Sequence, residues 1–156
     1  MKPWSIETRS VAETLDLGRR IGRAAQPGDV LALVGELGSG KTHLAKGIAE
    51  GLGGAEARSV VSPTFVLCRE YLHGRIPFYH FDAYRLKSAA DLEAIGAAEV
   101  FEGDGLSALE WADRTPGALP PDHLQIRFEV TGEESRRMTF AARGPQAKAL
   151  LAAIRG

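Results

Sequence analysis

A glycine-rich segment, Gly35–Thr42, carries the most specific chemical signal in this sequence. It reads Gly-Glu-Leu-Gly-Ser-Gly-Lys-Thr and fits the P-loop pattern G-x-x-x-x-G-K-S/T. In this pattern the glycines let the backbone curl, so that successive N–H groups form an anion-binding nest at the start of a helix. Lys41 would reach the β- and γ-phosphates of a nucleotide, and the Thr42 hydroxyl would bind Mg²⁺. The segment therefore predicts a nucleotide site.

Six residues of this segment are candidates for direct contact with the nucleotide: Gly35, Gly38, Ser39, Gly40, Lys41 and Thr42. The alternative is an ordinary glycine turn in front of a helix. The sequence context favours the nucleotide site, because the motif follows a buried apolar run and opens a helical segment.

A P-loop protein also needs an acidic group that holds or orders the metal, usually at the end of a neighbouring buried strand. Two residues are candidates for this role. Asp82 follows the apolar run Ile76–Phe81, and Glu110 follows Leu106–Leu109. Each could also be a solvated carboxylate at the end of a strand. The sequence alone does not choose between Asp82 and Glu110 as the principal metal ligand.

Other polar and aromatic residues carry weaker signals. Thr64, in Ser62-Pro63-Thr64, stands where a switch loop could sense the γ-phosphate, although this segment taken alone favours a simple Ser-Pro turn. Trp111 could be a core aromatic or a contact to nucleotide or partner. Arg85 and Arg114 could neutralise phosphate charge. The histidines and Cys68 do not have the spacing of a zinc site.

The segments around the P-loop read as the strand and helix of a parallel α/β unit. Asp29–Val34 is a short apolar run, typical of a strand covered on both faces. His43–Leu52 has helical character and ends at Gly53-Gly54. Upstream, Trp4–Arg9 reads as a strand, and Ser10 begins a Ser-x-x-Glu capping box. The helix after it has one face of small and apolar residues before Pro27-Gly28: Val11, Leu15, Gly18, Ile21, Gly22 and Ala25.

The rest of the chain predicts two hairpins and a further buried strand. Phe65–Tyr71 and Ile76–Phe81 form the first hairpin, and His123–Val130 and Arg136–Ala142 form the second. Leu106–Leu109 is the buried strand. Helices are predicted at Ser88–Ala98, with Leu92 and Ile95 inward, and near the C-terminus, marked by Ala147, Leu150, Leu151 and Ile154.

Composition fits an ordinary globular domain. The chain has 156 residues, of which 44% are hydrophobic and 25% charged, and its net charge is −1. Bulk charge therefore does not predict strong non-specific binding to nucleic acid or an anionic membrane. With Cys68 as the only cysteine there is no internal disulfide. No signal peptide or membrane-spanning run is recognised, so we expect a cytoplasmic protein. The expected fold class is α/β: one P-loop NTPase domain over residues 1–156, with a mixed, mainly parallel sheet flanked by helices.

The absence of two motifs narrows the choice of nucleotide. Guanine-specific GTPases read their base with an Asn-Lys-x-Asp motif, and this chain has no asparagine. It also has no Asp-x-x-Gly motif. A GTPase is therefore disfavoured.

Four motifs in this order closely resemble the bacterial TsaE (YjeE) family, small P-loop ATPases required for threonylcarbamoyladenosine (t6A) modification of tRNA. They are GELGSGKT (Gly35–Thr42), SPTF (Ser62–Phe65), HFDAYRL (His80–Leu86) and LEWADR (Leu109–Arg114). The resemblance is strong over about Asp29–Arg114 and weaker toward both ends. The P-loop occurs in many families, whereas HFDAYRL followed by LEW is specific.

The resemblance implies a cofactor pair, ATP and Mg²⁺, and weak ATP hydrolysis by the protein alone. It implies action with the TsaD–TsaB complex, which transfers threonylcarbamoyl to adenosine 37 of tRNA, with tRNA contacted through that complex and no membrane involved. The resemblance also implies roles for single residues. Lys41 and the loop amides bind phosphates, Thr42 and Glu110 hold Mg²⁺, and Asp82 supports the metal or the attacking water. Thr64 lies in the switch loop, Trp111 lies near the nucleotide or a partner, and Ser10 approaches the base. His43, where Thr is frequent in the family, is included among the nucleotide-site residues, although its side chain is expected to point away from phosphate.

Two other functions remain open from the sequence. A P-loop small-molecule kinase would need an acceptor pocket and an arginine-bearing lid, for which Ser88–Ala98 and Glu102–Gly105 are short. A binding module that uses nucleotide only as a structural or regulatory ligand would not need turnover. Lys41, Thr42 and the two carboxylates favour turnover.

Overall fold

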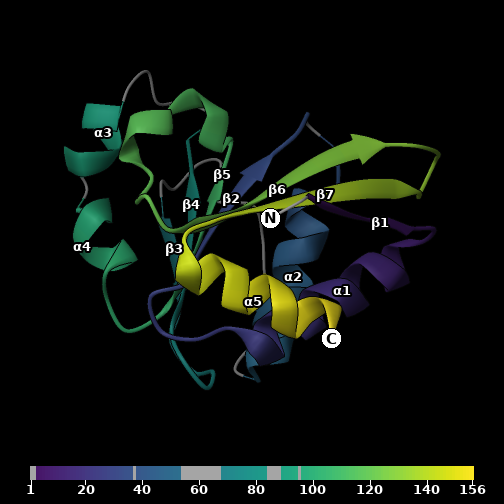
Figure 1. Ribbon diagram of the computed structural model, residues 1–156, viewed down its shortest axis with the longest axis horizontal. Helices are drawn as coiled ribbons and strands as arrows, with labels where there is room; N and C mark the ends of the chain where they lie inside the picture. The colour runs from purple at the N-terminus through teal and green to yellow at the C-terminus, as the bar shows by residue number, and fades with distance from the viewer. Residues whose placement is uncertain (1–2, 37, 54–67, 84–88, 95) are drawn as a thin grey trace.

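One seven-stranded sheet organises the protein (Figure 1). The computed structural model describes residues 3–36, 38–53, 68–83, 89–94 and 96–156. The strands are β1 (Trp4–Thr8), β2 (Val30–Val34), β3 (Cys68–Tyr71), β4 (Phe78–Asp82), β5 (Leu106–Glu110), β6 (His123–Val130) and β7 (Arg136–Arg143). The helices are α1 (Val11–Ala24), α2 (Lys41–Leu52), α3 (Ala89–Ala94), α4 (Ala97–Phe101) and α5 (Pro145–Arg155), with 3₁₀ helices η2 (Ala112–Arg114) and η3 (Pro116–Ala118).

The strand order is β1-β7-β6-β2-β5-β4-β3. The four central strands β6, β2, β5 and β4 run parallel to one another. The outer pairs β1–β7, β7–β6 and β4–β3 are antiparallel. The prediction of a mixed sheet is confirmed, but "mainly parallel" is wrong, because parallel and antiparallel pairs are equal in number. The parallel centre of the sheet is extended on one side by β7, the hairpin partner of β6, and on the other by β3, the hairpin partner of β4. A hairpin partner joins antiparallel, without a crossover helix.

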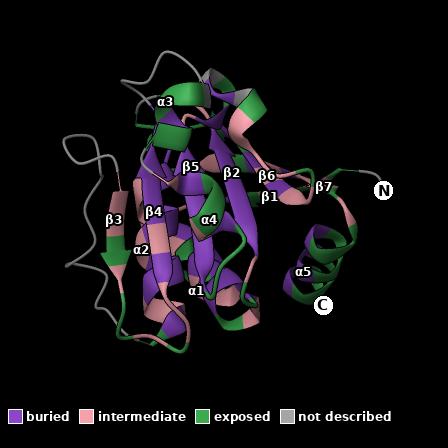
Figure 2. Ribbon diagram, turned by 90° about the vertical axis from the view of Figure 1, so that its left-hand side faces the viewer, coloured by how far each residue is buried: buried purple, intermediate pink, exposed green. Residues whose placement is uncertain are grey.

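Two apolar cores lie on opposite faces of the sheet, and Figure 2 shows the central strands buried between them. Alternate residues of one strand point to opposite faces. In β2, Leu31 and Leu33 therefore pack with α1, α2 and α5, while Val30, Ala32 and Val34 pack with the α3–α4 side. This double cover is the physical reason for the continuous apolar run of β2.

Helices α1 and α2 pack backbone against backbone. A Cβ atom added to Gly18 would lie 2.5 Å from the Leu44 carbonyl oxygen and 2.8 Å from the Gly47 Cα. The Arg19 Nε lies 2.6 Å from the Glu50 Oε1 and ties the same two helices together. Because α2 begins at the P-loop lysine, this contact fixes the position of the P-loop relative to α1.

Most predicted elements are confirmed, with local differences. Ser10 caps α1, its Oγ accepting from the Glu13 N–H at 3.1 Å. The buried face of α1 includes Thr14 and Leu17, which the prediction omitted. The predicted helix Ser88–Ala98 is wrong as one helix, because Gly96, at φ 80°, separates α3 from α4. Residues 65–67 of the predicted strand Phe65–Tyr71, and Ile95, lie outside the described residues.

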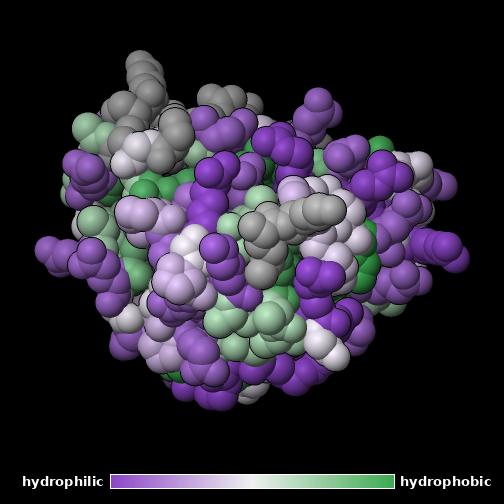
Figure 3. Space-filling model, viewed as in Figure 1, coloured by the Kyte–Doolittle hydropathy of each residue, from purple (hydrophilic) through white to green (hydrophobic). Residues whose placement is uncertain are grey.

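The face seen in Figure 3 is mainly hydrophilic, with apolar side chains in small areas between polar ones. Leu72 and Val130, each 55% exposed, are the large apolar side chains most open to solvent among the described residues. Within those same residues, no helix combines the length and apolar character needed to cross a bilayer.

Candidate nucleotide site

The P-loop, residues 35–42, joins the carboxyl end of β2 to the first turn of α2. Two glycines make its curl possible, since Gly38 has φ 77° and Gly40 has φ 105°, conformations that side chains with a Cβ rarely adopt. Gly40 is the N-cap of α2, and no side chain caps that helix end. The first amides of α2 and its positive dipole end are therefore available to an anion.

Ser39 in the middle of this loop is 1% exposed. Its Oγ has no hydrogen-bond partner among the described residues. A buried hydroxyl without a partner costs free energy, and a phosphate oxygen in the loop would supply the acceptor. The loop therefore fits a phosphate group.

Lys41 is folded back onto the loop that precedes it. Its Nζ donates to the Gly35 carbonyl oxygen and lies 3.5 Å from the Glu36 carbonyl oxygen. It also lies 3.4 Å from the centroid of the Trp111 ring, a cation–π contact. These contacts hold the ammonium group at the loop, where the P-loop pattern requires it.

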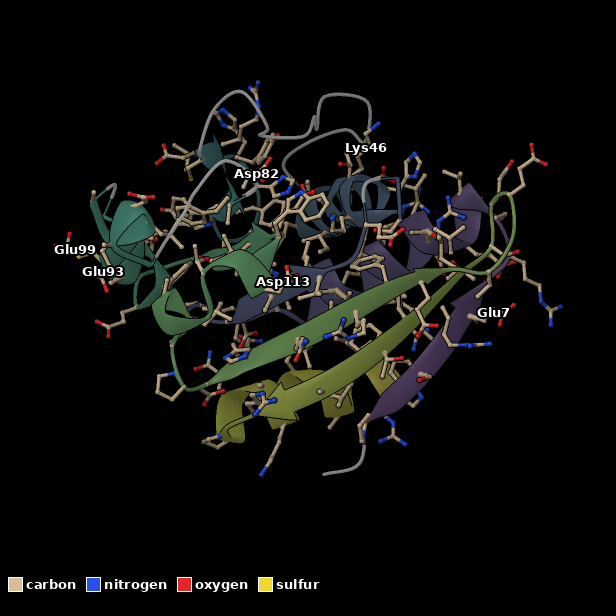
Figure 4. The ribbon with its side chains drawn as sticks, turned by 90° about the horizontal axis from the view of Figure 1, so that it is seen from above. Glu7, Lys46, Asp82, Glu93, Glu99 and Asp113 are labelled. Carbon is tan, nitrogen blue, oxygen red and sulfur yellow. The ribbon has the colours of Figure 1, made fainter. Side chains whose placement is uncertain are left out.

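Asp82 and Glu110 end two neighbouring strands at the same edge of the sheet as the P-loop. They are register partners in the parallel β4–β5 pair, and Glu110 is also the register partner of Leu33 in β2. Both carboxyl groups are buried, with exposed fractions of 2% for Asp82 and 3% for Glu110. Two buried carboxyl groups side by side call for a cation. Figure 4 shows Asp82 in the interior, whereas Glu93 and Glu99 lie on the outer side of α3 and α4.

His80 contacts Glu110 directly. The His80 Nε2 and the Glu110 Oε2 lie 2.5 Å apart, and the His80 side chain is fully buried. His80 precedes Asp82 by two residues in β4, so both side chains point to the face that carries Glu110. The imidazole therefore orients one oxygen of the Glu110 carboxylate.

The electrostatic environment of Lys41 links these groups. Burial lowers the pKa of the Lys41 ammonium, and the negative charges of Glu110, Asp113 and Asp82, in that order, act against this shift. Asp113 belongs to η2, directly after Trp111 and Ala112. A lysine held between a low-polarity environment and three acidic groups lies in a site with strong local fields.

Trp111 has an unusual backbone. Its φ is 59° and its ψ is 38°, the left-handed region, and it is the one non-glycine residue with positive φ in the part of the chain that the structure describes. Such a conformation costs of order 1 kcal/mol. It turns the chain sharply after β5 and brings the indole ring over Lys41.

The remaining predicted residues divide into three groups. Ser10 uses its hydroxyl to cap α1. His43 is half-buried in the first turn of α2, and burial lowers its pKa, with Lys46 and Arg136 adding to the shift. Thr64 and Arg85 lie outside the described residues, as does the side chain of Arg114.

A Mg²⁺ ion would find its protein ligands at this edge of the sheet. The described residues contain no group of three or more His, Cys, Asp or Glu side chains placed to hold a metal. A nucleotide-bound Mg²⁺ needs fewer, since phosphates and water complete its shell. Thr42, at the start of α2, and Glu110 or Asp82 are donors of the type Mg²⁺ prefers.

The sequence analysis did not single out three residues of this site. His80 could have been found, because it shares a strand face with Asp82. Asp113 follows the specific LEW motif and was not singled out. Arg136 begins β7, and its Nη2 lies 3.2 Å from the Gly38 carbonyl oxygen. No local sequence signal indicates Arg136, because the sheet brings it to the P-loop from a distant part of the sequence.

Comparisons with known proteins agree on one family. The family model described as "Threonylcarbamoyl adenosine biosynthesis protein TsaE" matches residues 8–138. The chain is 42% identical over 144 residues to the tRNA threonylcarbamoyladenosine biosynthesis protein TsaE of Bacillus subtilis, covering 92% of this chain and 89% of that protein. It is 40% identical over 134 residues to the protein of the same name in Treponema pallidum, covering 86% and 97%.

A solved structure is similar over nearly the whole chain. The crystal structure of YdiB from Bacillus subtilis superposes with a TM-score of 0.83 at 35% sequence identity, covering 99% of this chain and 95% of that one. The motifs at the carboxyl edge of the sheet, the matching family model and the similar fold lead to one conclusion: this chain belongs to the TsaE family.

Proposed function

We propose that this protein is a Mg²⁺-dependent ATPase that serves the t6A modification of adenosine 37 in tRNA, as an auxiliary of the TsaD–TsaB transfer complex. One observation carries the ATPase proposal. The P-loop, with Lys41 on it, lies at the same sheet edge as the buried register pair Asp82–Glu110. Phosphoryl transfer requires this combination of phosphate-binding and metal-ordering groups.

Each residue of the site has a distinct proposed role. The loop amides and the α2 N-terminus bind phosphate oxygens, and the Lys41 ammonium neutralises charge on the β- and γ-phosphates. Thr42 and Glu110 would hold Mg²⁺, and Asp82 would support that ion or orient the attacking water. When bound, Mg²⁺ neutralises charge that develops on the phosphates. His80 keeps the Glu110 carboxylate in one orientation.

Slow hydrolysis by the isolated protein fits the geometry. Arg136 is close to the P-loop, but backbone carbonyls already engage its guanidinium. Among the described residues it is the arginine bonded to the P-loop, so an arginine or another group from a partner could complete the site and accelerate hydrolysis. The names of the two bacterial relatives support tRNA t6A biosynthesis as the process that this activity serves. A protein that serves tRNA modification would act in the cytoplasm.

The test is ATP hydrolysis with Mg²⁺, by the protein alone and with TsaD–TsaB and tRNA. We expect slow basal hydrolysis, stimulation by the complex, and loss of both in Lys41→Ala. Lys148→Ala, an exposed lysine in α5, is the matched control. If the complex has no effect while a small metabolite becomes phosphorylated in step with ADP release, the protein is a small-molecule kinase instead.

A second comparison assigns the two carboxylates. Glu110→Gln and Asp82→Asn keep the shape of each side chain and remove its charge. The principal metal ligand is the residue whose variant shifts the Mg²⁺ dependence of ADP binding to higher concentrations. Glu93→Gln, on the outer side of α3, is the control. If neither variant changes the Mg²⁺ dependence, the metal assignment is wrong.

A further inference from the structure

Arg136 connects the β6–β7 hairpin to the P-loop. It is the first residue of β7, far from the P-loop in sequence. Its Nη1 donates to the carbonyl oxygens of Gly132 at 3.0 Å and Ser135 at 2.8 Å, both in the hairpin turn (residues 131–135). Its Nη2 donates to the Gly38 carbonyl oxygen at 3.2 Å. One guanidinium thus bridges the hairpin turn and the phosphate-binding loop.

The hairpin turn is itself anchored. The Thr131 N–H donates to the Ser135 carbonyl oxygen at 3.1 Å and closes the turn. The Glu134 Oε1 accepts from the Val11 N–H, the first residue of α1, at 3.2 Å. Arg136 therefore ties Gly38 to a support that is fixed to both the sheet and α1.

This arrangement determines the direction of one P-loop amide. The Gly38 carbonyl and the Ser39 N–H belong to one planar peptide unit and point in opposite directions. With the carbonyl held toward Arg136, the Ser39 N–H is directed into the loop, where it donates to the Glu36 carbonyl oxygen at 3.1 Å. The Gly38–Ser39 peptide is therefore held on both sides, by Arg136 at its carbonyl and by the Glu36 carbonyl at its N–H.

The positive charge of Arg136 also favours an anion at the P-loop. A cation at the N-terminal end of a helix is unfavourable, because that end carries partial positive charge. Arg136 and Lys46 nevertheless both lie close enough to the first turn of α2 to help lower the pKa of His43 there, after the larger effect of burial. Glu134 acts against that shift. The positive charges of Arg136 and Lys46 near this helix end suit an anion bound at the loop.

We propose that Arg136 is a positioning residue for nucleotide binding: its bidentate bridge between the hairpin turn and Gly38 keeps the P-loop in its curled, phosphate-binding conformation. This inference rests on the proposed nucleotide site. Arg137 is a matched control, because it is the next residue of the same strand, points to the opposite face and pairs with Glu7 and Glu129.

The experiment measures binding of ADP and of inorganic pyrophosphate to the full chain and to Arg136→Gln, Arg136→Lys and Arg137→Gln. We expect Arg136→Gln to bind both ligands about tenfold more weakly, the loss of one charge-assisted hydrogen-bond bridge. Arg136→Lys should also bind more weakly, because one ammonium cannot serve the hairpin turn and Gly38 together. Arg137→Gln should stay within about twofold of wild type.

Hydrogen exchange without nucleotide supplies a second readout. The P-loop amides should exchange faster in both Arg136 variants than in wild type and Arg137→Gln. Unchanged exchange and unchanged binding in Arg136→Gln would overturn the proposal. Wild-type affinity in Arg136→Lys would show that charge alone matters, which also overturns the bridge. If wild type itself binds neither ADP nor pyrophosphate, the proposed function fails instead, while the exchange result still judges the bridge.

Discussion

Gly18→Ala tests how closely α1 and α2 must approach to hold the P-loop in place. The added Cβ would lie 2.5 Å from the Leu44 carbonyl oxygen, 2.8 Å from the Gly47 Cα and 2.9 Å from the Ile48 nitrogen. All three atoms belong to the backbone of α2, so no side chain can rotate away. To reach an ordinary 3.4 Å contact, the two helices must separate by about 0.9 Å.

The expected cost follows from two opposing effects. Overpacking of a tight contact costs about 1–3 kcal/mol, and rigid backbone atoms place this site near the upper end. Replacing glycine by alanine within a helix returns about 1 kcal/mol. The net loss is about 2 kcal/mol, which lowers the melting temperature of a chain of this size by about 4–8 °C. ADP affinity should also fall, because α2 carries the first residues of the site.

Thermal and urea unfolding, with ADP binding, measure these effects. The control is Ala149→Gly on the exposed side of α5, which reports the helix-propensity contribution alone, about 1 kcal/mol. A Gly18→Ala protein that melts at or above the wild-type temperature would refute the reasoning, since propensity would then outweigh the contact. A large stability loss with unchanged ADP affinity would show that the P-loop does not depend on the position of α2.

Four further perturbations have definite expected outcomes. Burial raises the pKa of the Cys68 thiol to about 11 from 9.0, so at pH 8 alkylation should be about 100-fold slower in the folded than in the unfolded protein, as mass spectrometry would show. Asp122→Ala removes the carboxylate that accepts from two amides at the start of α5 and should cost about 1 kcal/mol in urea unfolding. At Trp111, with φ 59°, the Gly variant should be about 1 kcal/mol more stable than the Ala variant, the reverse of their order in a helix. Burial raises the pKa of Asp29 above 3.8, so ionisation of this carboxyl group lowers the stability of the folded protein as the pH rises. Asp29→Asn can still accept from the Gln26 N–H, so it should melt at a higher temperature than wild type at pH 7 and lose this difference below pH 3.8.

Much of the fold could be predicted because the signals are local. Ser10 and Glu13 define the start of α1 through one capping interaction, and the observed N-cap is Ser10. The β6–β7 hairpin was found from alternation around a polar turn, and its first strand has the predicted bounds His123–Val130. Where a local signal was short, the prediction was incomplete: Gly96 breaks the predicted helix because its left-handed conformation ends one helix and begins another.

The non-local contacts could not be predicted in the same way. Arg75, in the predicted β3–β4 loop, donates to the carbonyl oxygens of Gly22 and Ala25 at 2.9 Å and 2.7 Å and satisfies the C-terminal end of α1. Nothing in the sequence near Arg75 indicates this role. Such contacts depend on which elements the sheet brings together, and a side chain's partner across the fold leaves no periodic pattern in the sequence.

The sequence by itself determined the P-loop, the strand and helix around it and the two acidic candidates, because each depends on residues that are neighbours along the chain. Only the tertiary structure decided that Asp82 and Glu110 are register partners beside Lys41, that His80 orients Glu110, and that Arg136 holds Gly38. The physical reason is the strand order. Parallel pairing of β2, β5 and β4 aligns their carboxyl ends at one edge. Parallel pairing of β6 with β2 brings the β6–β7 turn to the same edge, and β7 begins there with Arg136.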